Sequence, residues 1–180
     1  RQLFKCRYLI EFPFYEKYQH LENSNICLVP QNILKELSKK NLNYLIILNL
    51  KIKKIDLQIK ISVQFVQGIN EIYLPHRILN SLNIQTGANI ELSYDFNKIY
   101  KKGESCNLQF HDCKFFDKCK NFKQILENKI KHNYIFLQQQ TVISIEYKGS
   151  TYLINIIKTH PEPVILVNNC DLIINFIEPL

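Results

Sequence analysis

The most constraining feature of this sequence is a short motif that occurs twice. Residues 28–37 read LVPQNILKEL and residues 73–82 read YLPHRILNSL. In both copies apolar residues lead into a proline, which is followed by two polar residues, Ile-Leu, two more polar residues and Leu. Because proline is favoured at the first position of a helix, each copy predicts a strand followed by a helix opened by Pro30 or Pro75. An internal repeat of this kind indicates a duplicated architecture.

The segments around the two copies repeat in the same order. Strands are predicted over residues 44–50 and 89–94, and strict apolar–polar alternation over 55–65 predicts a long strand between the copies. Two copies related by an approximate twofold axis would interlock into a closed barrel without exposed edges. The alternative is that the motif is a common amphipathic helix start. Residues 1–13 are expected to form an edge strand, and residues 19–25 a loop.

The second half of the chain is organised differently. Residues 96–120 show little periodicity and are expected to be a linker into a second unit. The fold class predicted is therefore β-rich α+β, with a barrel subdomain over 1–95 and a mixed α/β subdomain over 96–180. The elements predicted in the second subdomain are a helix over 121–132, a β-hairpin of 141–147 and 151–157, and strands over 164–167 and 172–177.

Composition limits the class of protein. The 180 residues are 46% hydrophobic and 22% charged, as in a soluble folded protein, and no apolar run approaches the ~20 residues that span a bilayer. The absence of Met predicts an excised fragment or a processed product. The net charge of +7 fits a nucleic-acid surface, but also a codon bias towards Lys. The six scattered cysteines favour free thiols in a reducing compartment over secretion with disulfides.

Catalytic and metal-binding motifs do not emerge from the sequence. Cys106, His111, Cys113 and Cys119 lie close together, but structural zinc sites usually use tight Cys-x-x-Cys pairs, so no metal is predicted. Thr86-Gly87 follows a glutamine, where the water-activating motif of an aspartic protease has a carboxylate. No phosphate-binding loop, zinc-protease or nucleophile-elbow motif occurs. We therefore expect a protein that is not an enzyme and needs no cofactor.

A nucleic-acid-binding module is the main alternative. Phosphate contact and base stacking need lysines interleaved with aromatic residues. Against this interpretation, Asp112, Asp117 and Glu127 interrupt the basic stretch. The residues of that stretch are Lys114, Lys118, Lys120, Lys123, Lys129 and Lys131, with Phe115, Phe116 and Phe122 among them.

Several short segments resemble a known family in the same order along the chain. They are Ile-Cys-Leu-Val-Pro with Ile-Leu and Leu at 26–37, Asn-Leu-Asn-Tyr at 41–44, Tyr-Leu-Pro-His at 73–76, Leu-Gln at 108–109, Lys-Gln-Ile-Leu-Glu-Asn at 123–128, and Cys170-Asp171, Phe176 and Pro179-Leu180 at the end. Together these segments resemble the amino-terminal domain of ubiquitin fusion degradation protein 1. The resemblance implies a double-psi β-barrel followed by a small mixed α/β subdomain.

The same resemblance implies a function. Members of that family are non-enzymatic, ubiquitin-binding adaptors that recruit substrates to a hexameric AAA unfoldase together with a nuclear protein localisation partner subunit. The segments that contact those two partners are expected outside this fragment. The implied location is the cytoplasmic surface of the ER membrane, without membrane insertion, in ER-associated degradation. A divergent paralogue for plastid import, in the periplastidal compartment of a complex plastid, is the alternative.

The residues expected to contact ubiquitin or polyubiquitin lie near the predicted junction of the subdomains. A ubiquitin surface offers a small apolar patch with a basic rim, so its receptor needs exposed apolar groups in a shallow groove. The predicted ubiquitin-binding residues are Tyr94, Phe96, Tyr100, Lys129 and His132. The alternative is that these aromatic residues only join the subdomains. Asn23-Ser24-Asn25 and Gln140-Thr141 depart from the glycine-containing turns common in the family.

Overall fold

The structure, a computed structural model, describes residues 2–38, 47–52, 55–95 and 98–180. It divides into two compact units, Arg1–Asn97 and Lys98–Leu180, here called the barrel unit and the second unit. In the described part of the chain, no helix has the length and apolar character needed to cross a membrane.

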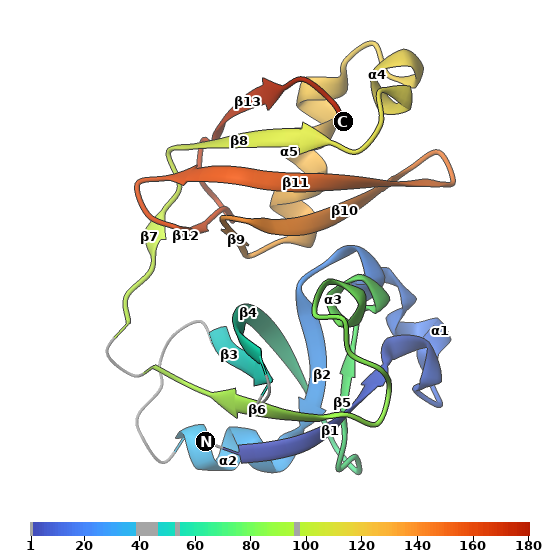
Figure 1. Cartoon of the computed structure of the whole chain (residues 1–180), viewed down its shortest axis with the longest axis vertical. Helices are drawn as coiled ribbons and strands as arrows, with labels where there is room; N and C mark the ends of the chain where they lie inside the picture. Colours follow the sequence, from blue (N-terminus) through green and yellow to red (C-terminus); the bar gives the residue numbers. More distant parts are fainter. Residues whose placement is uncertain (1, 39–46, 53–54, 96–97) are drawn as a thin grey trace. The chain divides into compact units, whose positions relative to one another are not determined.

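The barrel unit is a closed six-stranded barrel in the order β1-β5-β2-β4-β3-β6 (Figure 1). Its long strand β4 covers the residues whose alternation predicted it. The strands are β1 (Gln2–Tyr8), β2 (Ile26–Pro30), β3 (Ile47–Ile52), β4 (Ile55–Val66), β5 (Ile72–Leu74) and β6 (Asn89–Ser93). The helices are η1 (Leu9–Glu11), α1 (Tyr15–Tyr18), η2 (Gln19–Asn23), α2 (Gln31–Ser38) and α3 (His76–Ser81).

The strand pairings follow an approximate twofold exchange of the two halves. Strand β1 pairs parallel with β5 and antiparallel with β6, while β4 pairs parallel with β2 and antiparallel with β3. Exchanging β1 with β4, β2 with β5 and β3 with β6 therefore turns each pairing into another. The prediction of a closed barrel from a duplicated motif is confirmed, and with it the β-rich α+β fold class expected for a double-psi β-barrel.

The register shows the same relationship at the level of residues. Leu28 and Tyr73, which occupy the same motif position, are partners between β2 and β5. Between β3 and β6, Leu50 lies opposite Leu92. The twofold axis thus passes between strands that pair with their own counterparts, and equivalent residues of the two copies meet there.

The motif prolines lie one position earlier than predicted. Pro30 is the last residue of β2, and Pro75 precedes the first residue of α3 with ψ of 139°. The extended ψ of Pro75 cannot belong to a helix, so neither proline opens its helix: Pro30 ends β2, and Pro75 lies between the end of β5 and the start of α3. The apolar residues of the helices behave as expected: Ile33 and Leu37, like Ile78 and Leu79, are buried in the barrel core.

Two expectations for the first 25 residues are wrong. Strand β1 ends at Tyr8, and it lies between β5 and β6 inside the closed barrel, not at an edge. Residues 19–25 are not a simple loop, because η2 occupies Gln19–Asn23. The first three residues of the strand predicted over 44–50 lie outside the described residues.

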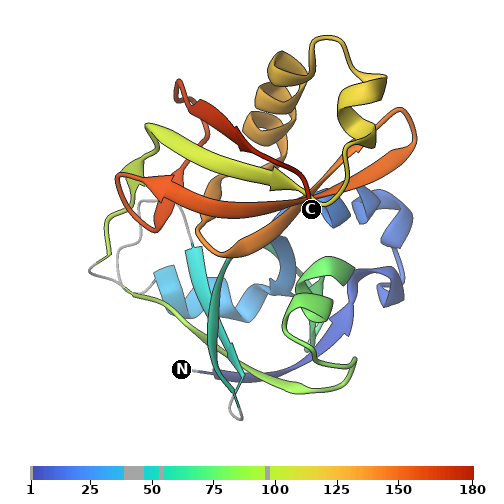
Figure 2. The same cartoon turned by 45° about the horizontal axis from the view of Figure 1, so that its top comes forward.

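The second unit contains a four-stranded sheet in the order β10-β11-β8-β13 and a three-stranded sheet in the order β7-β12-β9. Its core packs α5 against one face of the larger sheet through Leu126 and Ile130 (Figures 1 and 2). The strands are β7 (Lys101–Lys102), β8 (Ser105–Phe110), β9 (Phe136–Gln138), β10 (Thr141–Tyr147), β11 (Ser150–His160), β12 (Val164–Leu166) and β13 (Ile173–Ile177). The helices are α4 (Lys114–Lys118) and α5 (Phe122–Asn133).

The prediction of a linker over residues 96–120 is wrong, because this segment contains a strand and a helix. Strand β8 lies inside the larger sheet between β11 and β13, and α4 follows it. Cys106, Leu108 and Phe110 point into the core, while the intervening polar residues do not. The alternation was therefore present, but a cysteine and the polar neighbours concealed it.

Candidate functional site: an aromatic groove on the barrel

The two halves of the barrel differ most in one pair of equivalent connections. The β1–β2 connection, residues 9–25, carries η1, α1 and η2, whereas its counterpart between β4 and β5 is only residues 67–71. A groove of about 750 Å³ lies between these connections. It is lined by Phe12, Pro13, Phe14, Lys17 and Tyr18 on one side, and by Val66, Gln67, Gly68, Ile69, Asn70, Glu71 and Tyr73 on the other.

A buried phenylalanine organises the aromatic side chains of the groove. Phe12 is 5% exposed, and its ring packs edge-to-face on Tyr18 and Tyr73, with centroids 5.4 and 5.0 Å away. Its third edge-to-face partner is Phe14, at 5.9 Å, which is 69% exposed. Edge-to-face contacts of this kind hold aromatic rings in defined positions. In the groove, the exposed phenylalanine Phe14 is therefore held by the buried ring of Phe12.

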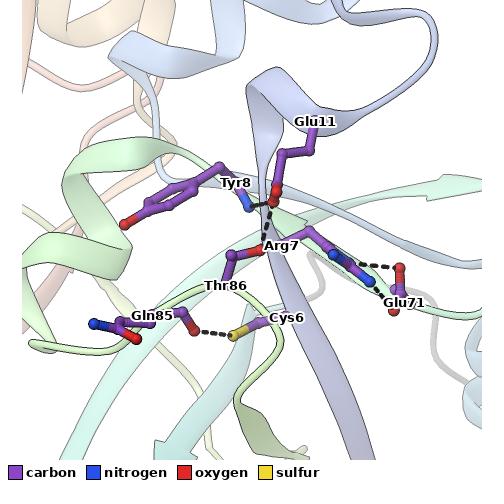
Figure 3. A network of polar contacts seen from close by, with 7 residues as sticks. All are labelled: Cys6, Arg7, Tyr8, Glu11, Glu71, Gln85 and Thr86. Atoms are coloured by element: carbon purple, nitrogen blue, oxygen red, sulfur yellow. Dashed lines mark hydrogen bonds and ion pairs between the residues drawn. The ribbon is translucent and has the colours of Figure 1, made fainter.

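An ion pair lies at the rim of the groove. The Arg7 guanidinium donates two hydrogen bonds to the Glu71 carboxylate, at 2.9 and 3.2 Å (Figure 3). The hydrogen bond from Arg7 lowers the pKa of Glu71, so the carboxylate stays charged in mildly acidic solution. Burial, followed by the charge of Glu71, raises the pKa of Tyr73, which therefore remains a neutral phenol.

Two glutamates fix the ends of the long connection to the second half of the barrel. Glu11 accepts hydrogen bonds from the Tyr8 backbone N–H and the Thr86 hydroxyl (Figure 3). Glu22 accepts one from the backbone N–H of His76, at the start of α3. These hydrogen bonds hold the wall of the groove in place, and the exposed aromatic side chains take no part in them.

The ubiquitin-binding residues predicted from the sequence fall in both units. Tyr94 is half-buried and packs against the barrel core, and Phe96 lies outside the described residues. In the second unit, Tyr100 is half-buried, with the Lys98 ammonium 5.8 Å from its ring centre. Lys129 and His132 lie on the last turns of α5.

Of these residues, Lys129 and His132 lie on the same helix within one turn of each other. Lys129 is half-buried, whereas His132 is exposed and has Nδ1 2.7 Å from the Asn128 carbonyl oxygen. That the five residues form a common ubiquitin surface stays a prediction.

The cysteine and histidine cluster of the second unit has other roles in the fold. Cys106 and Cys119 are buried in the core, Cys113 is exposed, and His111 Nε2 lies 2.7 Å from Asn155 Oδ1. Across the described ranges, no three His, Cys, Asp or Glu side chains are grouped so that they could hold a metal ion.

The phenylalanines of the basic stretch belong to the core of the second unit. Phe115 is fully buried, and Phe116 and Phe122 pack against the core and edge-to-face with Phe176. Their faces are committed to one another and do not offer an open platform for bases. Of the lysines in the stretch, Lys114, Lys118, Lys120 and Lys123 are exposed, and so are Asp112 and Asp117, which interrupt it.

Comparison with known proteins finds a family model that matches most of the second unit. Residues 102–179 match the family model of ubiquitin fusion degradation protein UFD1, N-terminal subdomain 2. This match and the relatives below confirm the predicted resemblance to the amino-terminal domain of the ubiquitin fusion degradation protein 1 family.

Individual relatives match over most of the chain. The ubiquitin recognition factor in ER-associated degradation protein 1 of Homo sapiens and that of Mus musculus are each 27% identical over 168 residues, which is 89% of this chain and 51% of the relative. Ubiquitin fusion degradation protein 1 of Saccharomyces cerevisiae is 28% identical over 156 residues, 84% of this chain and 42% of the relative. The chain spans about half the length of the curated relatives it matches.

Proposed function

We propose that this chain is a non-enzymatic, ubiquitin-binding adaptor that recruits ubiquitylated proteins for extraction or degradation. The mammalian relatives are named as ubiquitin recognition factors in ER-associated degradation, and the yeast relative as a ubiquitin fusion degradation protein. The proposal carries that role over to this chain, which aligns with those relatives over 84–89% of its length.

The observation that carries the proposal is the aromatic groove of the barrel unit. An apolar patch on a partner can bury the exposed ring of Phe14, which already rests on Phe12. Around the groove, the β1–β2 connection contains Glu11, Glu16 and Glu22 against a single lysine, Lys17. This acidic segment of a chain with net charge +7 complements the basic rim of the ubiquitin patch.

The groove favours a modest affinity for a single ubiquitin. Its lining supplies one exposed aromatic anchor, and a tight protein interface usually buries several. Linked ubiquitins would bind more strongly, because a second contact within the same complex adds avidity. The surface predicted from the sequence, with Tyr94, Phe96, Tyr100, Lys129 and His132, is the proposed second contact.

The finer parts of the proposal concern assembly and location. We propose that other segments of the full protein engage a nuclear protein localisation partner subunit and a hexameric AAA unfoldase. The proposed location is the cytoplasmic face of the ER membrane, and plastid protein import in a periplastidal compartment is the alternative.

Titration of a fluorescently labelled chain with ubiquitin tests the proposal. We expect saturable binding to single ubiquitin, tighter binding to linked ubiquitin, and a weaker dependence on salt than nucleic-acid binding would show. A parallel titration with single-stranded RNA tests the nucleic-acid alternative, whose binding would fall steeply as salt rises. Binding to RNA without binding to linked ubiquitin would refute the adaptor proposal.

A further inference from the structure

Strand β13 forms one edge of the four-stranded sheet. It pairs with β8, and in the described part of the chain no strand pairs with its other side (Figure 1). Apolar side chains are exposed along it: Ile173 is 62% exposed and Ile177 is 36% exposed. Natural edge strands usually carry charges or prolines that prevent pairing with other chains, and β13 has neither.

One hydrogen bond shows which residues of β13 direct their backbone N–H and C=O groups towards the open edge. The N–H of Ile173 donates to the Glu104 carbonyl, at 2.9 Å, in the pairing with β8. In a parallel ladder the residues that bond a given neighbour alternate, so Asn175 and Ile177 also direct their backbone groups towards β8. The N–H and C=O groups of Ile174 and Phe176 therefore point to the open edge.

On the exposed face of β13, the order of side-chain types is the same in both strand directions. Ile174 and Phe176 face the core, whereas Ile173, Asn175 and Ile177 are exposed on the opposite face. The exposed sequence is thus Ile, Asn, Ile, with Asn175 at its centre. A pattern of this kind is self-complementary about a twofold axis.

We propose that two copies of this chain pair through β13, antiparallel, about a twofold axis at Asn175. In this register Ile174 of each copy lies opposite Phe176 of the other, and the outward backbone groups of both residues meet to form four hydrogen bonds. Ile173 packs against the partner's Ile177. The two copies of Asn175 face each other as a non-hydrogen-bonded backbone pair, with Cα atoms roughly 4.5 Å apart.

The asparagine at the axis has the hydrogen-bonding capacity that this pairing needs. Asn175 Nδ2 donates to Asn107 Oδ1, at 3.2 Å, within its own chain. The Asn175 side chain also has a second amide hydrogen and a carbonyl oxygen. These groups can form reciprocal hydrogen bonds with the partner's Asn175. Since five residues form the shared edge, the interface falls below the roughly 1,200 Å² of stable complexes, and association is concentration-dependent.

Sedimentation velocity over a wide concentration range tests the pairing. The weight-average sedimentation coefficient of the unmodified chain is expected to rise from the monomer value towards the dimer value. Asn175→Asp places two carboxylates at the axis and should weaken dimerisation at least about tenfold. Asn107→Asp is the matched control: it perturbs the same amide contact and adds the same charge, but one strand away from the axis, and should leave dimerisation nearly unchanged.

A cross-link tests the register independently of those variants. In a Cys113→Ser background, Asn175→Cys should form a disulfide-linked dimer under mild oxidation, because opposite Cα atoms lie within the range that a disulfide spans. Ile173→Cys should not, since its counterpart is Ile177 and not itself. A chain that stays monomeric at all concentrations, or that cross-links equally at both positions, overturns the proposal.

Discussion

Leu28 and Tyr73 are antiparallel partners between β2 and β5, and they hold the same position in the two copies of the repeated motif. The two copies use that position differently. Leu28 is fully buried and packs with Phe12, whereas Tyr73 is half-buried and lines the groove. The two halves of the barrel therefore differ close to the twofold axis. The long β1–β2 connection covers Leu28, and a groove lies beside Tyr73.

Truncation of Leu28 should destabilise the barrel strongly. Leu28→Ala removes a fully buried side chain at the junction of the two halves and should lower the free energy of unfolding by about 3 kcal/mol. Leu34→Ala, in the same motif but only half-buried on α2, should cost about 1 kcal/mol. Urea unfolding monitored by circular dichroism measures both values. Equal losses for the two variants would contradict the role given to Leu28.

Removal of the exposed ring of Phe14 should weaken binding to ubiquitin. Phe14→Ser is expected to raise the Kd for linked ubiquitin at least about tenfold, because an anchor side chain in a groove contributes most of the local binding energy. Ile10→Ser is the matched control, since Ile10 is 62% exposed on the same connection but does not line the groove. Calorimetric titration with the folded variants measures both affinities, and an equal effect of the two changes would argue against the groove.

The ionisation of Glu71 should depend on Arg7. The hydrogen bond from Arg7 lowers the pKa of Glu71 in the folded protein, so its contribution to stability is present above the unfolded carboxyl pKa of ~4.3 and is lost as pH falls through the folded value. Arg7→Gln should return the pKa of Glu71 towards its ordinary value. Carbon-detected NMR titration of the Glu71 carboxyl measures this shift. Identical titration curves with and without Arg7 would contradict the assignment.

Thiol reactivity should separate the six free cysteines. Cys113 is exposed and should react rapidly with Ellman's reagent in the native protein. Burial raises the pKa of Cys27, and raises that of Cys106 to about 12, so both thiols should react only after unfolding. Cys113→Ser should remove the fast phase. A fast phase that survives this change would show that a thiol described as protected is accessible.

The barrel could be predicted from the sequence because the repeated motif indicates which distant strands pair with each other. Equivalent motif residues such as Leu28 and Tyr73 meet across the axis, so a local pattern carried information about distant contacts. Strand β8 was missed because Asn107 and Gln109 form side-chain hydrogen bonds across the sheet with Asn175 and Asn155. Such polar residues in the middle of a sheet look like a linker in a single sequence.

The groove could not be predicted because its apolar residues resemble a strand. Phe12 and Phe14 continue the alternation of β1, although one ring is buried and the other exposed. The available signal was the unequal length of two equivalent connections, residues 9–25 and 67–71, which marks an insertion in one copy of the repeat. Residues on both connections form the groove, and only tertiary structure brings them together.

Chemical-shift mapping tests the central claim most directly, namely that the barrel groove binds ubiquitin. In amide spectra of the isotopically labelled chain titrated with linked ubiquitin, the account predicts the largest shifts in residues 12–18 and 66–73. Shifts near Tyr94, Tyr100, Lys129 and His132 would add the second contact predicted from the sequence. A saturating titration that leaves 12–18 and 66–73 unshifted would contradict the account.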